Sequence, residues 1–394
     1  MQLKIIFCAL FALRSVLGFG QLPDLTPLSK ISVLTCGPGE ELSSTFGHTA
    51  IRIQDPTLNL DIVMGYGGFD FDDPNFYWKF TTGKLDYTMT AHRFSSFLEG
   101  YKQENRWVSE QVLHLSTESK NAIFNALKEN YSIENWGYKY DFLFDNCATR
   151  IPDIFKNALG EKVEYDFTHL ESNATFRQLI HENLTWNAWD TFGIDLALGA
   201  VIDRKATPWE HQFLPIYVSD QLAHTSLDKR PIANEKTILF KALPGRDKSL
   251  FILSPLFFAI VLLALVVFKT YTDYKKNKRT KWLDFGLFFL SGAAGLLISF
   301  LWFVTDHAST KLNFNILWAF PLNLLIAFML LKARPVKQWL LNYLWVLLAF
   351  LAITMLLWLF KLQIFSPLII FLMLALGFRY LFLLHYFKHE IDNS

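Results

Sequence analysis

Two residues, Cys147 and His48, have the types and settings that nucleophilic chemistry requires. Cys147 stands in Phe144-Asp-Asn-Cys-Ala-Thr-Arg150, just before a stretch whose apolar pattern predicts a helix over residues 149–159. A helix N-terminus stabilises a thiolate, and its N–H groups can bind the oxyanion that forms during acyl transfer. His48 follows Gly47 on a predicted strand, a setting that no other histidine before residue 250 shares, so it is our candidate base.

Each of these residues also has a structural interpretation. A histidine on a strand is more often a satisfied core residue than a catalytic base. Cys36 and Cys147 are the two cysteines that follow the N-terminal apolar segment, so an oxidising compartment could join them in one disulfide. A bonded Cys147 would make the domain a scaffold and not an enzyme. Cys36 also suits simple packing near the His48 strand.

Several other function classes lack their signatures in this sequence. The cysteines and His48 have no zinc-ligand spacing, and no Cys-x-x-Cys pair occurs. No phosphate-binding loop and no Gly-x-Ser-x-Gly motif is present. The net charge of +1 provides no basic surface for nucleic acid. The sequence therefore predicts no metal, no cofactor and no nucleic-acid partner.

The elements that position the two candidates are a mixture of strands and helices. Residues 31–34 and 45–53 are expected to be strands, and residues 60–66 would form a hairpin with the second of them. Residues 119–131 and 149–159 have helical spacing. These elements, with the strands first and the helices after them, are typical of an α+β domain.

Export of this domain is expected from the N-terminus. Residues 1–20 have a short basic start, an apolar core and small residues at the end, as in a secretory signal peptide, although an uncleaved signal anchor is the rival interpretation. The expected division is a signal at residues 1–20, a periplasmic domain at 21–248 and a transmembrane bundle at 249–394.

Five apolar runs predict an all-helical membrane bundle of about five spans. Spanning a bilayer takes about 20 apolar residues, so the third run is marginal. Lysine and arginine gather between runs one and two and between runs three and four, which makes those loops cytoplasmic and the segment before Leu250 external. The runs are residues 250–268, 282–304, 316–331, 339–360 and 364–384.

Asp306 and His307 stand at the external end of the second run. Polar residues at a membrane edge are commonly interface residues. The functional alternative is that they line a headgroup or substrate site facing the exported domain.

Three motifs, in the order in which they occur along the chain, resemble those of a known family. They are Leu34-Thr-Cys-Gly-Pro-Gly-Glu with Phe46-Gly-His-Thr-Ala-Ile-Arg52 and Tyr66-Gly-Gly-Phe-Asp-Phe71; then Tyr138-Lys-Tyr-Asp-Phe142 with Asp145-Asn-Cys-Ala-Thr-Arg150; and Gly199-Ala-Val-Ile-Asp-Arg-Lys-Ala-Thr-Pro208 with Phe213-Leu-Pro215. Together they resemble the Bacteroidetes family whose periplasmic domain was formerly of unknown function and which includes a lipoprotein N-acyltransferase. The likeness covers roughly residues 30–220 and extends into the membrane half through Asp306-His307 and residues 315–322.

The resemblance implies a permuted papain-like fold, related to the NlpC/P60 group, in which the histidine strand precedes the cysteine helix. Cys147 would be the nucleophile and His48 its base. For the orienting residue, Asp61 is the candidate, with Tyr66 behind it or lining the substrate site. Asn146 is a possible oxyanion or orienting donor. Relatives favour Asn before the Tyr-Gly pair, whereas this chain has Gly65.

The function implied is a bacterial inner-membrane acyltransferase in lipoprotein biosynthesis. It would move a fatty acyl chain from a phospholipid to the α-amino group of a diacylated lipoprotein's N-terminal cysteine. The alternative, implied by the wider superfamily, is a cysteine peptidase or amidase acting on cell-wall peptide.

Overall fold

The computed structural model describes residues 23–132, 134–135, 137–170, 173–243, 250–332 and 337–392. The expected signal peptide, residues 1–20, lies outside this range. The chain forms two compact units that interleave in sequence. The first unit is Met1–Asn173 with Ala206–Pro244, and the second is Ala174–Lys205 with Gly245–Ser394.

The first unit is built on a seven-stranded sheet in which every neighbouring pair is antiparallel. The expected hairpin is present, with Ala50 opposite Gly65 and Asp55 opposite Leu60. In spatial order the strands are β10 (Thr237–Phe240), β5 (Val108–Val112), β1 (Lys30–Cys36), β2 (His48–Asp55), β3 (Leu60–Gly68), β4 (Asp86–Arg93) and β6 (Gly137–Lys139).

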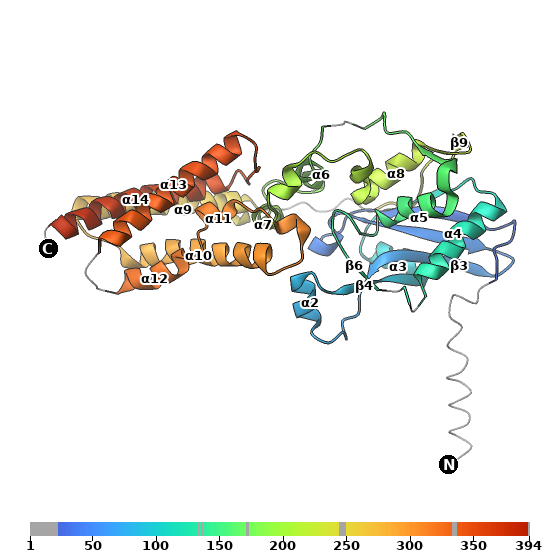
Figure 1. Ribbon diagram of the computed structural model, residues 1–394, viewed down its shortest axis with the longest axis horizontal. Helices are drawn as coiled ribbons and strands as arrows, with labels where there is room; N and C mark the ends of the chain where they lie inside the picture. Colours follow the sequence, from blue (N-terminus) through green and yellow to red (C-terminus); the bar gives the residue numbers. More distant parts are fainter. Residues whose placement is uncertain are drawn as a thin grey trace, which may run out of the picture. The chain divides into compact units, whose positions relative to one another are not determined.

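Helices cover both faces of this sheet (Figure 1). On one face, Ile51, Ile53 and Met64 pack against α4 (Thr117–Asn130), α5 (Arg150–Leu159) and α8 (Pro215–Ala223). On the other face, Ala50 and Val63 lie under Phe94 and Phe97 of α3 (Phe94–Gln103). The alternation of side chains along a strand thus gives β2 two apolar faces. The α+β prediction is confirmed.

Smaller elements complete the first unit. A three-stranded antiparallel sheet lies beyond the end of α5, and a short helix joins β3 to β4. These elements are β7 (Val163–Tyr165), β8 (Thr225–Leu227), β9 (Arg230–Pro231) and α2 (Phe76–Thr82).

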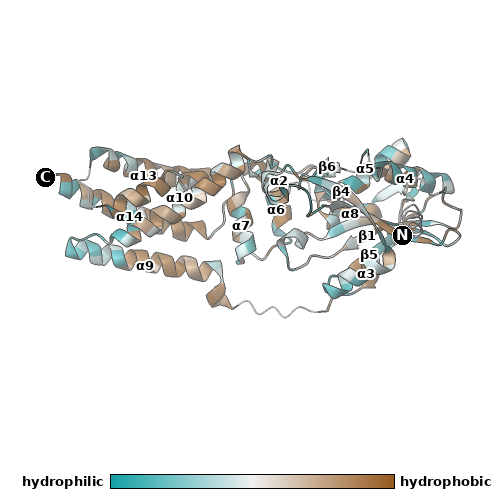
Figure 2. Cartoon of the chain, turned by 90° about the horizontal axis from the view of Figure 1, so that it is seen from below, coloured by the Kyte–Doolittle hydropathy of each residue, from teal (hydrophilic) through white to brown (hydrophobic). Residues whose placement is uncertain are grey.

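The second unit contains four helices long and apolar enough to cross a membrane, within the part of the chain that the structure describes. Figure 2 shows the apolar residues that run along them. They are α9 (Pro255–Lys276), α10 (Lys281–Phe303), α13 (Gln338–Leu359) and α14 (Ile369–Asp392). They correspond to the first, second, fourth and fifth predicted runs.

The third predicted run, residues 316–331, is apolar and largely helical but shorter than the other four, and it is not one continuous helix. The run is split into α11 (Asn315–Trp318) and α12 (Asn323–Leu331). Pro321 lies in the break, where proline removes a backbone donor. Asn323 is fully buried there and bonds Ser291 Oγ at 3.0 Å and the Tyr343 hydroxyl at 2.6 Å. The Asn323 side chain at the break is therefore fully hydrogen-bonded, and the break is part of the packed structure.

Residues 174–205 group with the helical unit, although the expected boundary at residue 249 puts them in the exported domain. They form α6 (Phe176–His181) and α7 (Trp189–Ala197). Buried Arg177 pairs with Asp203 at 2.7 Å and with Asp195 at 3.0 Å. Gly199 N–H bonds the Ser309 carbonyl at 3.0 Å, and a Cβ at Gly199 would lie 2.0 Å from the Lys311 carbonyl oxygen. The third family-like motif therefore docks on the loop after α10.

The approach of α10 to the broken helix depends on glycine. Gly295→Ala would place a Cβ 1.8 Å from the Ala319 carbonyl oxygen. We expect the detergent-solubilised variant to lose about 1–3 kcal/mol of stability and to unfold at a lower temperature. Gly286→Ala on the same helix is the control, because its methyl group meets no described atom within 4 Å. Equal unfolding temperatures for the two variants would contradict this packing.

Candidate functional site

Cys147 reaches the end of β2 from the start of α5. The helix packs on the sheet face that carries Ile51 and Ile53. The main-chain N–H groups of Thr49, Cys147 and Ala148 face the sulfur. The pairing of β2 with β3 begins only at Ala50, so the Thr49 amide lies where the two strands have separated. The sulfur therefore occupies a gap at the edge of the ladder.

His48 stands at the same end of β2, because it is the first residue of the strand and precedes Thr49. Its ring lies on the sheet face of Ala50 and leans over β3. A Cβ at Gly65 would lie only 3.1 Å from His48 Nε2 and 3.4 Å from the Ala50 Cβ. Glycine at position 65 thus makes room for the imidazole. It also means that β3 offers the ring no orienting side chain at its nearest position.

The electrostatics of the site favour a neutral thiol beside a neutral imidazole. Burial raises the pKa of Cys147 to about 11, although the main-chain amides that face the sulfur act to lower it. Burial, together with the positive charge of Arg106, lowers the pKa of His48 to about 4. Both shifts oppose a resting thiolate–imidazolium pair. Above about pH 4 the His48 imidazole is therefore neutral, which is the form that a general base needs.

Arg106 is a component of the site that no sequence pattern indicated. Its Nε donates to the Gly37 carbonyl at 2.9 Å, and its Nη1 donates to Glu104 at 2.8 Å. The side chain is nearly buried and lies over the ring of Tyr101. Its charge lowers the pKa values of both His48 and Cys147. Arg106 is separated from the three family-like motifs, so motif spacing could not have found it.

Cys36 packs directly beside the candidate base. It is the register partner of His48 in β1 and is 1% exposed. Burial raises its pKa to about 12, against a lowering contribution from the Tyr101 hydroxyl. Cys36 and Cys147 are both free thiols. The two cysteines are thus not joined in a disulfide, and Cys147 stays the candidate nucleophile.

Asn146 positions the backbone and does not face a substrate. Its Nδ2 donates to the Phe142 and Phe213 carbonyls at 2.7 and 2.9 Å. Its Oδ1 accepts from the Ala148 and Thr149 amides at 2.7 and 3.0 Å. Both amide hydrogens are thus engaged, which leaves no oxyanion donor on this side chain. Asn146 instead fixes the turn that carries Cys147.

Asp61 and Tyr66 do not take up the roles expected of them. Asp61 lies opposite Gln54, six residues along β2 from His48, and forms a bidentate pair with Arg52 at 2.8 Å. Tyr66 is 3% exposed, and its hydroxyl accepts a hydrogen bond of 2.7 Å from Asn130. The structure therefore places Cys147 and His48 at the same end of β2 and brings neither Asp61 nor an exposed Tyr66 to that end.

The other site predictions concern the membrane unit and metals. Asp306 is exposed and His307 is partly buried at the end of α10, where the His307 carbonyl accepts from Thr310 Oγ1 at 3.0 Å. Their role with substrate stays a prediction, because they belong to the second unit. Among the described residues, no group of three or more His, Cys, Asp or Glu side chains could hold a metal ion.

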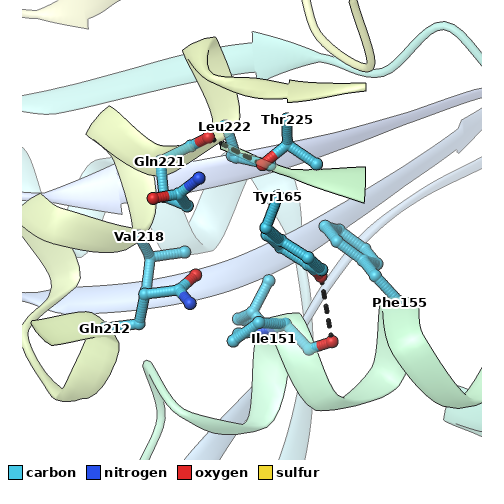
Figure 3. Close-up of a pocket in the computed structure, with 9 residues that line it drawn as sticks. Ile151, Phe155, Tyr165, Gln212, Val218, Gln221, Leu222 and Thr225 are labelled. Carbon is cyan, nitrogen blue, oxygen red and sulfur yellow. Dashed lines mark hydrogen bonds between the residues drawn. The ribbon is translucent and has the colours of Figure 1, made fainter. Parts of the chain in front are cut away.

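A small cavity under α5 is too small for substrate (Figure 3). Its volume is about 10 Å³, the size of one water molecule. Tyr165 donates from its hydroxyl to the Pro152 carbonyl at its edge, and Gln212 and Gln221 line it. It belongs to the core behind α5.

Comparison with known families gives two matches. Residues 24–182 match the Lnb N-terminal periplasmic domain, and residues 246–390 match the Lnb transmembrane domain. Together the matches describe a multi-pass membrane protein with a periplasmic N-terminal domain. No curated protein and no solved structure matched. The permuted papain-like relationship therefore stays a prediction.

The neutral state of the pair predicts how Cys147 reacts with iodoacetamide. Only about one thiol in 10⁴ is ionised at pH 7 when the pKa is near 11, so the alkylation rate should rise about tenfold per pH unit up to pH 10. Peptide mass spectrometry would separate modification at Cys147 from that at Cys36. His48→Ala is the matched control and should change the rate little. Fast, pH-independent alkylation that His48→Ala abolishes would show a resting ion pair instead.

Proposed function

This chain belongs to the Lnb family, and we propose that it is a cysteine-dependent lipoprotein N-acyltransferase of the bacterial inner membrane. It would take an acyl chain from a phospholipid ester and pass it, through a thioester on Cys147, to the α-amino group of a lipoprotein's N-terminal cysteine. One observation carries the proposal: a free, partly buried thiol lies against the Thr49 amide, at the strand end that carries His48.

The first half-reaction forms the thioester. As the Cys147 sulfur attacks the ester carbonyl carbon, His48 takes the thiol proton. The tetrahedral intermediate then collapses, the ester C–O bond breaks, and His48 returns the proton to the departing lysophospholipid oxygen. A neutral imidazole is the form that this step needs, and the low pKa of His48 supplies that form.

Main-chain amides are the donors available for the oxyanion. The Thr49 and Cys147 N–H groups face the sulfur, whereas the Ala148 N–H already donates to Asn146. Two fixed amides at a partly desolvated position stabilise a developing alkoxide without reorganisation. The gap between β2 and β3 thus supplies the donor that a side chain would otherwise provide.

The second half-reaction transfers the chain to nitrogen. An α-amine has an ordinary pKa near 8, so part of it is neutral at working pH. Its nitrogen attacks the thioester carbonyl and loses a proton to His48, and the thiolate leaves and is reprotonated. The products are an amide and the free thiol. No cofactor enters either step.

The membrane unit supports acyl transfer over the peptidase alternative. Both proposed substrates carry acyl chains and reside in lipid, and four apolar helices hold this chain in the same phase. A peptidase that cleaves soluble cell-wall peptide needs no such bundle. The two functions also differ in acceptor, which is an amine for the acyltransferase and water for the peptidase.

Complementation tests the function in cells. A strain that lacks N-acylated lipoproteins should regain them with the wild-type chain. Cys147→Ser and His48→Ala should reduce the N-acylated fraction below about one thousandth of wild type, because each removes a partner of one catalytic unit. The measurement is mass spectrometry of lipoprotein N-termini.

Asp61→Asn is the matched control, since its partner is Arg52 and not His48. It should retain N-acylation at comparable protein levels. Full N-acylation by the stably expressed Cys147→Ser variant would refute the proposed function.

A further inference from the structure

A cluster of exposed aromatic side chains projects from the connection between β3 and β4. Five rings within twelve residues have two-fifths or more of their surface exposed, and only Phe76 among the six is buried. Monomeric domains rarely expose apolar groups together in this way without a partner. We call residues 69–80 the aromatic loop; its exposed rings are Phe69, Phe71, Tyr77, Trp78 and Phe80.

The aromatic loop is a built patch and not a set of isolated rings. Phe76 forms its centre, with ring centroids 4.9 Å from Phe71, 5.6 Å from Phe69 and 5.3 Å from Tyr77. The helix α2 ends at Gly83, whose φ of 71° closes the turn. Phe76 is buried and packs against its neighbours, so it holds the exposed rings in place around it.

Polar groups of the loop are largely used within it. Asp70 accepts from the Asp72 amide at 2.9 Å, and Asp73 pairs with Lys79 at 2.5 Å. Asp70, Asp72 and Asp73 against Lys79 leave the loop a net charge of −2, so attraction to an anionic surface does not supply its partner. The face offers mainly aromatic area, and aromatic rings are the side chains that favour the membrane–water interface.

A row of rings connects the loop with the nucleophile. The Phe69 and Tyr87 centroids are 5.8 Å apart, and those of Tyr87 and Tyr140 are 4.7 Å apart. The main chains of Asp141 and Asp145 donate to each other at 3.0 Å, so the chain folds back there and Tyr140 lies beside the segment that carries Cys147. A contact between protein copies would not require such a row.

We propose that the aromatic loop enters the outer leaflet of the membrane that holds the chain, and that the row Phe69–Tyr87–Tyr140 guides a phospholipid acyl chain to Cys147. The inference rests on the proposed function and adds the route by which the donor arrives. A bilayer is the chosen occupant because the chain is anchored in one, so a lipid surface is always within its environment.

Depth-dependent fluorescence tests the membrane contact without any reaction. The full chain is reconstituted in phosphatidylcholine nanodiscs with or without brominated acyl chains. Subtracting the Trp78→Phe signal from the wild-type signal isolates Trp78, and bromine should quench that difference at least about twofold. Trp209, which packs on Tyr165 inside the first unit, is the control and should not be quenched in the same subtraction. Equal emission from Trp78 in both lipids would overturn the proposal.

A second measurement separates docking from chemistry. The amount of thioester formed is measured with bilayer phosphatidylcholine and with soluble dihexanoyl phosphatidylcholine, and the first is divided by the second. The ratio for the Phe71→Ser/Trp78→Ser double variant is then compared with that for the wild-type chain. This ratio should fall at least about tenfold, since about 1.4 kcal/mol of lost burial corresponds to a factor of ten. An unchanged ratio would contradict the membrane contact. Quenching of Trp78 with no thioester from either lipid would uphold the contact and reject the proposed function.

Discussion

The contact between the Cys147 sulfur and the Thr49 amide is the constraint on which the site depends. It exists because β2 and β3 separate before Thr49, which leaves one strand amide free to face a group from outside the sheet. The helix α5 brings the sulfur from one face, while His48 leans over Gly65 from the other. Changing the strand ends or the helix packing would take the sulfur away from the Thr49 amide, and a side chain at position 65 would displace the His48 ring.

Burial then determines the resting protonation states of Cys147 and His48. The site disfavours charge on both members of the pair, so a thiol and an imidazole wait in neutral form. The buried guanidinium of Arg106 adds to this state at His48 and partly relieves it at Cys147. A neutral resting pair suits the proposed reaction, because a lipid ester could enter without displacing water from a stable ion pair.

Much of this arrangement was predictable from sequence. Hydrophobic alternation indicated the β2–β3 hairpin, helical spacing indicated α5, and glycine before His48 marked its strand. The orienting residue was not predictable, because sequence proximity made Asp61 a candidate while the register places it six residues from His48, against Arg52. The role of Asn146 was misjudged for a related reason: which carbonyls its amide reaches is set by tertiary packing. Length could mark the third membrane run as marginal, but only packing shows that Asn323 makes its break tolerable.

Intact-protein mass spectrometry with a defined phospholipid tests the central claim most directly. The detergent-solubilised full chain is incubated with phosphatidylethanolamine of known acyl composition and no acceptor amine. The account predicts one added acyl mass, mapped to Cys147, released by neutral hydroxylamine as a thioester and absent from Cys147→Ser. A folded wild-type protein that gains no acyl group, or one whose acyl group persists in Cys147→Ser, would contradict it.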